Sequence, residues 1–129
     1  MTLVLDSGGL SALARSPARL EQIRARGLWP PIVPVAVLVE SLTGDHRRDF
    51  HLNRLLRACT IRADTELIGR HAAALRFATR REGINAVDAL VVAFADHAGG
   101  GMVFTSDPKD LQALAANTIH PVSVAGCDR

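Results

Sequence analysis

The sequence predicts an α/β fold with a mostly parallel central sheet and helices on both faces. Short apolar runs of strand length alternate along the chain with longer stretches of helical periodicity. Repeated strand–helix units are typical of parallel sheets whose connections cross over in a right-handed sense. With 129 residues and 48% hydrophobic residues, the chain has the size and composition of one domain, so we expect residues 1–129 to form a single domain.

Strands are expected where short apolar stretches are bounded by turn or helix-cap residues. They lie at residues 3–5, 32–33, 60–63, 102–104 and 122–125. The helical patterns lie at residues 11–14, 18–26, 35–43, 48–58, 65–82, 86–98 and 107–115. The longest of these is amphipathic and is expected to end at Gly83, and Asn85 is the expected N-cap of the next helix.

Composition favours a cytoplasmic protein with an affinity for polyanions. The longest apolar run is interrupted by Asp88 and is too short to cross a bilayer, and no export signal is recognisable at the N-terminus. Cys59 and Cys127 are far apart and form no metal-ligand or disulfide framework, so we expect two reduced thiols, with one remote disulfide as the alternative. Fourteen of the fifteen basic residues are arginines, whose planar guanidinium groups match phosphate oxygens.

Two aspartates directly follow predicted strands. Asp6 ends the first strand, and Asp107 follows the strand at residues 102–104 after two hydroxyl residues. In open parallel sheets, ligands bind beyond the carboxyl ends of the strands, so both aspartates are candidates for a site there. Each also has an ordinary structural explanation, because Asp6 can cap a helix and Asp107 can do so before Pro108.

Two further acidic residues interrupt apolar helical stretches. Glu40 lies in a helix that is apolar on nearly every side, where a carboxylate is unfavourable unless an arginine or a divalent cation compensates it. Asp88 lies in another such stretch, at the third helical position after Asn85, where it can form a capping box. Each acidic residue can be explained singly, but the structural roles do not explain why all four occur together.

The order and spacing of these residues resemble the PIN domain and, within it, the VapC-type toxins of prokaryotic toxin–antitoxin pairs. The motifs are LVLDS at Asp6, VLVESL at Glu40, DALVVA at Asp88 and TSDPKDL at Asp107, and the resemblance covers nearly the whole chain. The chain departs from many relatives at residues 8–9, where two glycines replace a hydroxyl or other small residue. A polar contact from position 8 is therefore not expected.

The resemblance implies an endoribonuclease that depends on Mg²⁺, or alternatively Mn²⁺, and hydrolyses RNA phosphodiester bonds with metal-activated water. The implied catalytic residues are Asp6, Glu40, Asp88 and Asp107, and weaker candidates for supporting contacts are Ser7, Thr105 and Asp110.

We expect Asp6 and Asp88 to be direct metal ligands, since Mg²⁺ prefers hard oxygen donors. Glu40 and Asp107 would bind a second cation, hold water or act as general base, and the sequence leaves the number of cations open. No cluster of Cys and His indicates zinc, and the scattered histidines are expected at the surface.

The same resemblance implies three partners: an RNA substrate, a small cognate antitoxin whose tail covers the cleft, and a second copy of the chain. The helix at residues 65–82 and the early helices are candidates for the homodimer interface. RNA binding through arginines should weaken with salt, and stacking on aromatic side chains should contribute little because there is one Trp and no Tyr.

Other classes of protein fit the sequence less well. A receiver domain needs an adjacent acidic pair after the first strand, and a haloacid-dehalogenase phosphatase needs Asp-x-Asp, whereas Ser7 and Gly8 follow Asp6. The main alternative is a catalytically silent PIN-fold module that binds RNA or a protein. The presence of all four carboxylates argues against it.

Overall fold

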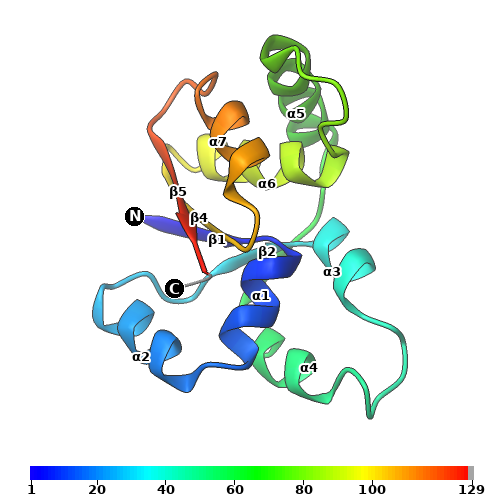
Figure 1. The fold of residues 1–129 in the computed structure, drawn as a ribbon, viewed down its shortest axis with the longest axis vertical. Helices are drawn as coiled ribbons and strands as arrows, with labels where there is room; N and C mark the ends of the chain where they lie inside the picture. Colours follow the sequence, from blue (N-terminus) through cyan, green and yellow to red (C-terminus); the bar gives the residue numbers. More distant parts are fainter. Residues whose placement is uncertain (128–129) are drawn as a thin grey trace.

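The computed structural model describes residues 1–127 and places a parallel sheet between two layers of helices (Figure 1). The strands are β1 (Thr2–Leu5), β2 (Ile32–Pro34), β3 (Thr60–Arg62), β4 (Gly101–Thr105) and β5 (Val122–Gly126). The helices are α1 (Ser7–Ala14), α2 (Pro17–Ala25), α3 (Val35–Ser41), α4 (Phe50–Leu56), α5 (Glu66–Thr79), α6 (Ala86–His97) and α7 (Pro108–Ala115).

The five strands are all parallel and lie in the order β3-β2-β1-β4-β5. From β1 the chain first builds outward to β3 and then returns to add β4 and β5 on the other side of β1. The strand order therefore reverses between β1 and β4, and the carboxyl ends of these two strands are where such folds place a ligand site. The predicted fold class is confirmed, with a fully parallel rather than a mostly parallel sheet.

The core lies on both faces of this sheet. Figure 1 shows α1, α2 and α4 on one face and α5, α6 and α7 on the other. Leu3, Val4 and Leu5 are consecutive and all buried, as expected for a strand that is covered on both sides. The run from Val91 to Asp96 in α6 is also buried, because this helix packs centrally between the sheet and α5.

Several element boundaries differ from the sequence-based prediction. Helix α1 begins at Ser7 rather than at residue 11, because the Asp6 side chain caps it by accepting a hydrogen bond from Gly9 N. Helix α5 ends at Thr79, before Gly83, and Arg80 terminates it in the left-handed conformation. Asn85 is the N-cap of α6, as predicted. No helix within residues 1–127 has the length and apolarity needed to span a membrane.

The two glycines after Asp6 allow the first turn of α1 to pack against the end of β4. A Cβ atom on Gly9 would lie 2.0 Å from the carbonyl oxygen of Phe104, and one on Gly8 would lie 2.0 Å from Ser106 Oγ. Side chains at these positions would force the helix away from the strand. The departure from the PIN pattern at residues 8–9 is therefore a packing requirement of this chain.

We predict that Gly9→Ala lowers the free energy of unfolding by about 1–3 kcal/mol, the usual range for overpacking. The neighbour it meets is backbone, which cannot rotate away. Gly69→Ala is the matched control, because Gly69 lies inside α5 with open space around it and alanine there should stabilise by up to about 1 kcal/mol. Urea unfolding of both variants checks this, and a neutral Gly9→Ala would contradict the close packing.

Candidate active site

Asp6 is held rigidly at the carboxyl end of β1. It is 7% exposed, and its Oδ1 accepts a hydrogen bond from Gly9 N at 2.7 Å while its Oδ2 accepts one from Thr105 Oγ1 at 2.5 Å. The helix-capping role considered for Asp6 is thus confirmed. It does not compete with a metal role, because each carboxylate oxygen has further lone pairs. Burial, partly offset by these hydrogen bonds, raises the pKa of Asp6, and nearby Asp107 raises it further.

Thr105 connects the ends of β1 and β4. Its hydroxyl donates to Asp6 and accepts a hydrogen bond from the backbone N–H of Asp107 at 3.0 Å. Asp107 is the N-cap residue of α7 by position, but its side chain makes no capping hydrogen bond. The capping explanation for the Asp107 carboxylate is therefore wrong, and its exposed side chain is available for another role.

Asp88 lies in the first turn of α6 and carries the most perturbed carboxylate of this group. Asn85 caps the helix by accepting a hydrogen bond from Val87 N, whereas Asp88 forms no hydrogen bond within residues 1–127, so the predicted capping box is absent there. Burial raises the pKa of Asp88 to about 6, and four carboxylates raise it as well. They are Asp6, Glu40, Asp110 and Asp107, in decreasing order of effect. The predicted acidic residues therefore converge electrostatically on Asp88.

Glu40 is exposed, so the expectation that burial makes it unfavourable is wrong. Helix α3 buries only Val37, and it leaves Val39 81% exposed. Because the helix is apolar on almost every side, its sequence pattern does not show which face meets the core. Glu40 nevertheless lies close enough to Asp88 to act on its pKa.

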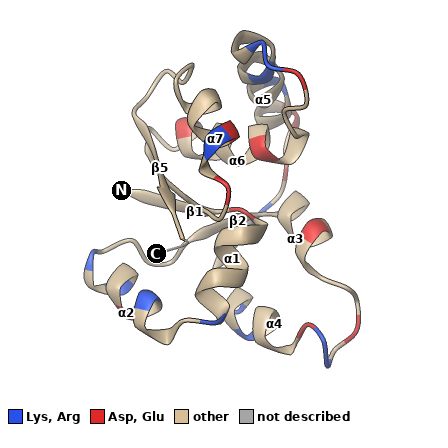
Figure 2. Ribbon diagram, in the orientation of Figure 1, with Lys and Arg blue, Asp and Glu red and all other residues tan. Residues whose placement is uncertain are grey.

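The electrostatics and donor chemistry of this group fit a hard divalent cation. Figure 2 shows acidic segments on α3, at the start of α6 and around the start of α7. Among the described residues, the ion pair that involves this group joins Asp110 to Arg81 at 3.1 Å, so the negative charge of the group is only partly compensated. The donors are carboxylate and hydroxyl oxygens, as Mg²⁺ and Mn²⁺ prefer.

These carboxylates are not arranged as a closed metal site. Within residues 1–127 no group of three or more His, Cys, Asp or Glu side chains is positioned to hold a metal ion. Cation binding would thus require the less constrained side chains, such as those of Glu40 and Asp107, to turn toward the rigid Asp6. Ser7, a weaker candidate, begins α1 without a hydrogen bond to these carboxylates in the described part of the chain.

A second carboxylate on α6, which the sequence did not single out, has a structural role. Asp96 is fully buried and accepts hydrogen bonds from Ile119 N, from His120 N and from the ring of His71. Burial alone would raise its pKa, but these hydrogen bonds outweigh it and the pKa of Asp96 is lowered. His71 and His120 are thus partners of Asp96. His120 is exposed, as expected for the histidines, whereas His71 is partly buried.

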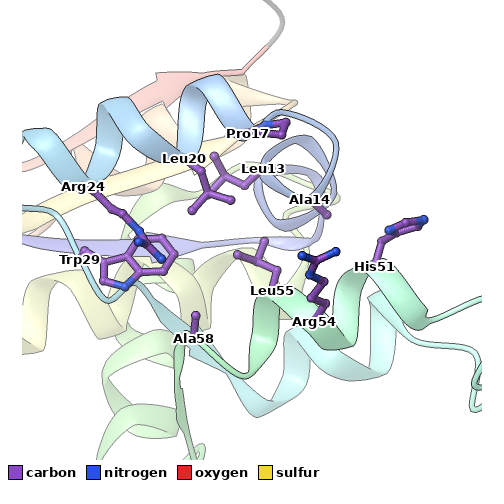
Figure 3. Close-up of a pocket in the computed structure, with 10 residues that line it drawn as sticks. All are labelled: Leu13, Ala14, Pro17, Leu20, Arg24, Trp29, His51, Arg54, Leu55 and Ala58. Atoms are coloured by element: carbon purple, nitrogen blue, oxygen red, sulfur yellow. The ribbon is translucent and has the colours of Figure 1, made fainter.

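Cys59 and the apolar pocket lie apart from this chemistry, whereas the backbone N–H of Cys127 donates to the carbonyl oxygen of Thr105 at 2.8 Å. No disulfide joins Cys59 to Cys127, and burial raises the pKa of Cys59 to about 11. A pocket of about 370 Å³ lies between α1, α2 and α4, and within it Arg24 stacks on Trp29 at 4.5 Å from the ring centroid (Figure 3). None of the four carboxylates lines it. The group of acidic residues instead lies where the strands of the sheet have their carboxyl ends.

Comparison with known proteins identifies the fold. No protein-family model matches the chain, and no curated protein matches it by sequence. VapBC2 from Rickettsia felis, solved bound to a DNA fragment from their promoter, matches with a TM-score of 0.71 and 14% identity over 97% of this chain and 99% of that chain. PAE2754 from Pyrobaculum aerophilum matches with a TM-score of 0.58 and 18% identity over 95% of this chain and 83% of that chain. The fold is therefore PIN-like, as the resemblance implied.

The opposite pKa directions of Asp88 and Asp96 predict opposite pH dependences of stability. The folded pKa of Asp88 is raised to about 6, so the metal-free protein loses stability as pH rises from about 4 to about 6, where the folded state binds more protons than the unfolded state. Asp88→Asn should remove this loss and be equally or more stable at pH 7. Asp96→Asn should instead lower stability by about 1–3 kcal/mol at pH 7, because buried donors lose their charged partner.

Thermal melts in EDTA across this pH range measure both effects. The deficit of Asp96→Asn should shrink as pH falls below about 4, where the unfolded carboxyl begins to take up protons. A metal-free Asp88→Asn protein that is less stable than wild type at pH 7 would show that Asp88 has a structural role and not a repulsive one.

Proposed function

We propose that this protein is a Mg²⁺- or Mn²⁺-dependent endoribonuclease that hydrolyses RNA phosphodiester bonds, and that it is the toxin of a toxin–antitoxin pair. The observation that carries the proposal is the convergence of Asp6, Glu40 and Asp107 on Asp88, whose pKa rises to about 6. Like charges gathered at the strand-order reversal of a PIN-like sheet destabilise the protein unless a cation binds there. A bound divalent cation would supply positive charge that activates water and offsets charge on the phosphodiester.

The residues divide into a fixed and an adjustable set. Asp6 is oriented by Gly9 N and Thr105 Oγ1, which makes it the preorganised ligand. Asp88 would be the second direct ligand, and its raised pKa makes cation binding compete with protonation below about pH 6. Glu40 and Asp107 are exposed, so either can accept a proton from water at the scissile phosphate or complete the cation site.

The binding partners are proposed by analogy with a protein of similar fold. The Rickettsia felis structure is a VapBC2 complex, and we propose by analogy that a small cognate antitoxin covers the acidic edge of this chain. A homodimer belongs to the same proposal, and sedimentation of the purified protein tests it. A catalytically silent PIN-fold module that binds RNA or protein is the second candidate, favoured by the lack of a ready metal-binding group in residues 1–127.

Purified protein should cleave RNA in the presence of Mg²⁺ or Mn²⁺, and EDTA should stop the cleavage. Zn²⁺ should not support cleavage better than Mg²⁺ or Mn²⁺ does. Asp6→Asn and Asp88→Asn should each lower the cleavage rate by orders of magnitude. Glu66→Gln is the control, because Glu66 is an exposed carboxylate that pairs with Arg70 at the start of α5.

Thermal melts with Mn²⁺ give an independent readout of the same site. Wild-type protein should gain about 2.7 kcal/mol at a hundredfold excess of cation over its dissociation constant. Asp88→Asn should gain much less, and Glu66→Gln should gain as much as wild type. Robust cleavage in EDTA by a homogeneous preparation, or unchanged cleavage by Asp88→Asn, would overturn the mechanism.

A further inference from the structure

A depression at the carboxyl-terminal end of α5 combines arginines with an exposed aromatic ring. It has a volume of about 500 Å³ and is lined by Ala73, Arg76, Phe77, Arg80 and Arg81, which we call the α5 arginine patch. No carboxylate is among these lining residues. Figure 2 shows basic segments at this end of α5 and on the connection that follows it. The chemistry of the patch is thus cationic and aromatic.

Phe77 and Arg80 form its central pair. The Phe77 side chain is 75% exposed, and the guanidinium carbon of Arg80 lies 5.4 Å from the centroid of its ring. The ring therefore presents a flat apolar face to solvent. A flat ring beside a flat cation offers a nucleobase two surfaces on which to stack, and every base can use them.

The backbone at Arg80 supports a role for its side chain. Arg80 has φ 53°, and among residues 1–127 it is the one non-glycine residue with positive φ. Helices that end in this left-handed conformation usually carry glycine or asparagine there, because a larger side chain is unfavourable. The arginine at this position has its guanidinium next to the Phe77 ring, a contact that glycine cannot make.

The α5 arginine patch adjoins the group of acidic residues around Asp88. Arg81 pairs with Asp110 at 3.1 Å, and Asp110 is one of the carboxylates that raise the pKa of Asp88. Arg76 Nε donates to the carbonyl of Ile84 at 3.0 Å, which ties α5 to the connection leading into the N-cap of α6. Arg81 therefore connects the patch, through Asp110, to the carboxylates that surround Asp88.

We infer that the α5 arginine patch binds single-stranded RNA next to the scissile phosphate, with one base stacked on Phe77 and Arg80 and the phosphates held by Arg76 and Arg81. The inference rests on the proposed function and specifies its substrate as unpaired RNA, since only an unstacked base presents a free face. It also refines the expectation from composition, because one exposed phenylalanine supplies the stacking that tyrosines and tryptophans do not.

A second copy of the chain fits this surface less well. A two-fold contact centred on the patch would bring the same arginines of both copies together, and like charges that face each other across an interface oppose association. RNA provides the opposite charge and the flat surfaces at once. Dimerisation through Phe77 is nevertheless a measurable outcome of the test below.

The test compares RNA binding in EDTA and RNA cleavage with Mn²⁺ for variants of the full chain. The probe is a fluorescein-labelled single-stranded RNA of random sequence, with inorganic polyphosphate as a polyanion that has no bases. Phe77→Leu removes the ring and Phe77→Trp restores one, while Arg80→Asn removes the guanidinium and tolerates the left-handed backbone. The matched controls are Phe50→Leu, an exposed phenylalanine on α4, and Arg26→Asn, an exposed arginine that caps α2 on the other face of the sheet.

Phe77→Leu should weaken RNA binding at least about fivefold, the lower end of what one stacked base contributes, and should leave polyphosphate binding unchanged. Arg80→Asn should weaken the binding of both RNA and polyphosphate, and Phe77→Trp should bind RNA as tightly as wild type. The two control variants should bind RNA and polyphosphate as wild type does. In the cleavage assay, Phe77→Leu and Arg80→Asn should raise KM and leave kcat unchanged, since the patch does not include the carboxylates proposed to bind the cation.

The outcomes separate this inference from the proposed function. If Phe77→Leu and Arg80→Asn cleave RNA at the wild-type rate and with the same KM as the controls, the inference about the patch is wrong and the proposed nuclease activity is unaffected. RNA binding that depends on the patch without any metal-dependent cleavage would support the patch and favour the silent module. A monomer produced by Phe77→Leu with unchanged RNA affinity would overturn the inference by showing that Phe77 is a dimer contact.

Discussion

The hydrogen bond between Asp6 and Thr105 is the contact on which the site depends. It joins the ends of β1 and β4, two strands that are neighbours in the sheet and 99 residues apart at this point of the chain. The pairing of Leu5 with Phe104 brings the two residues together, Gly8 and Gly9 let α1 approach the end of β4, and the Thr105 hydroxyl also accepts a hydrogen bond from the backbone N–H of Asp107. One hydroxyl thus sets the position of two acidic residues, and the rigid half of the site is built into the sheet itself.

Helix α6 shows how one element supports both stability and chemistry. Asp96, near its carboxyl-terminal end, is buried among donors from the α7–β5 connection, so its charge is stabilised and its pKa is lowered. Asp88, in its first turn, meets burial and four other carboxylates, so its charge is destabilised and its pKa is raised to about 6. The surroundings and not the residue type decide which carboxylate is stabilised in its charged form and which is destabilised.

The sequence predicted the strands, most helices and the aspartates at the strand ends, because apolar period and parallel topology determine those features. It did not predict that Glu40 is exposed, since a helix that is apolar all round gives no sign of which face meets the sheet. It also missed Asp96, and it named Thr105 as a supporting contact without identifying Asp6 as its partner, because both interactions depend on residues distant in the chain. The arginines near the site could not be identified for the same reason, as only the fold brings Arg81 to Asp110.

A nuclease with an acidic centre must bind a polyanion that its own carboxylates repel. A cation can neutralise the centre, but it acts over a short range because salt screens charges beyond about 10 Å. The flanking nucleotides therefore need positively charged side chains of their own to bind, and these side chains must not neutralise the carboxylates of the cation site. In this chain Arg81 lies between the two regions: it pairs with Asp110 at the rim, whereas Asp6 and Asp88 have no ion pair within residues 1–127. In the proposed nuclease, the α5 arginine patch would attract the strand while the inner carboxylates keep the charge that a divalent cation requires.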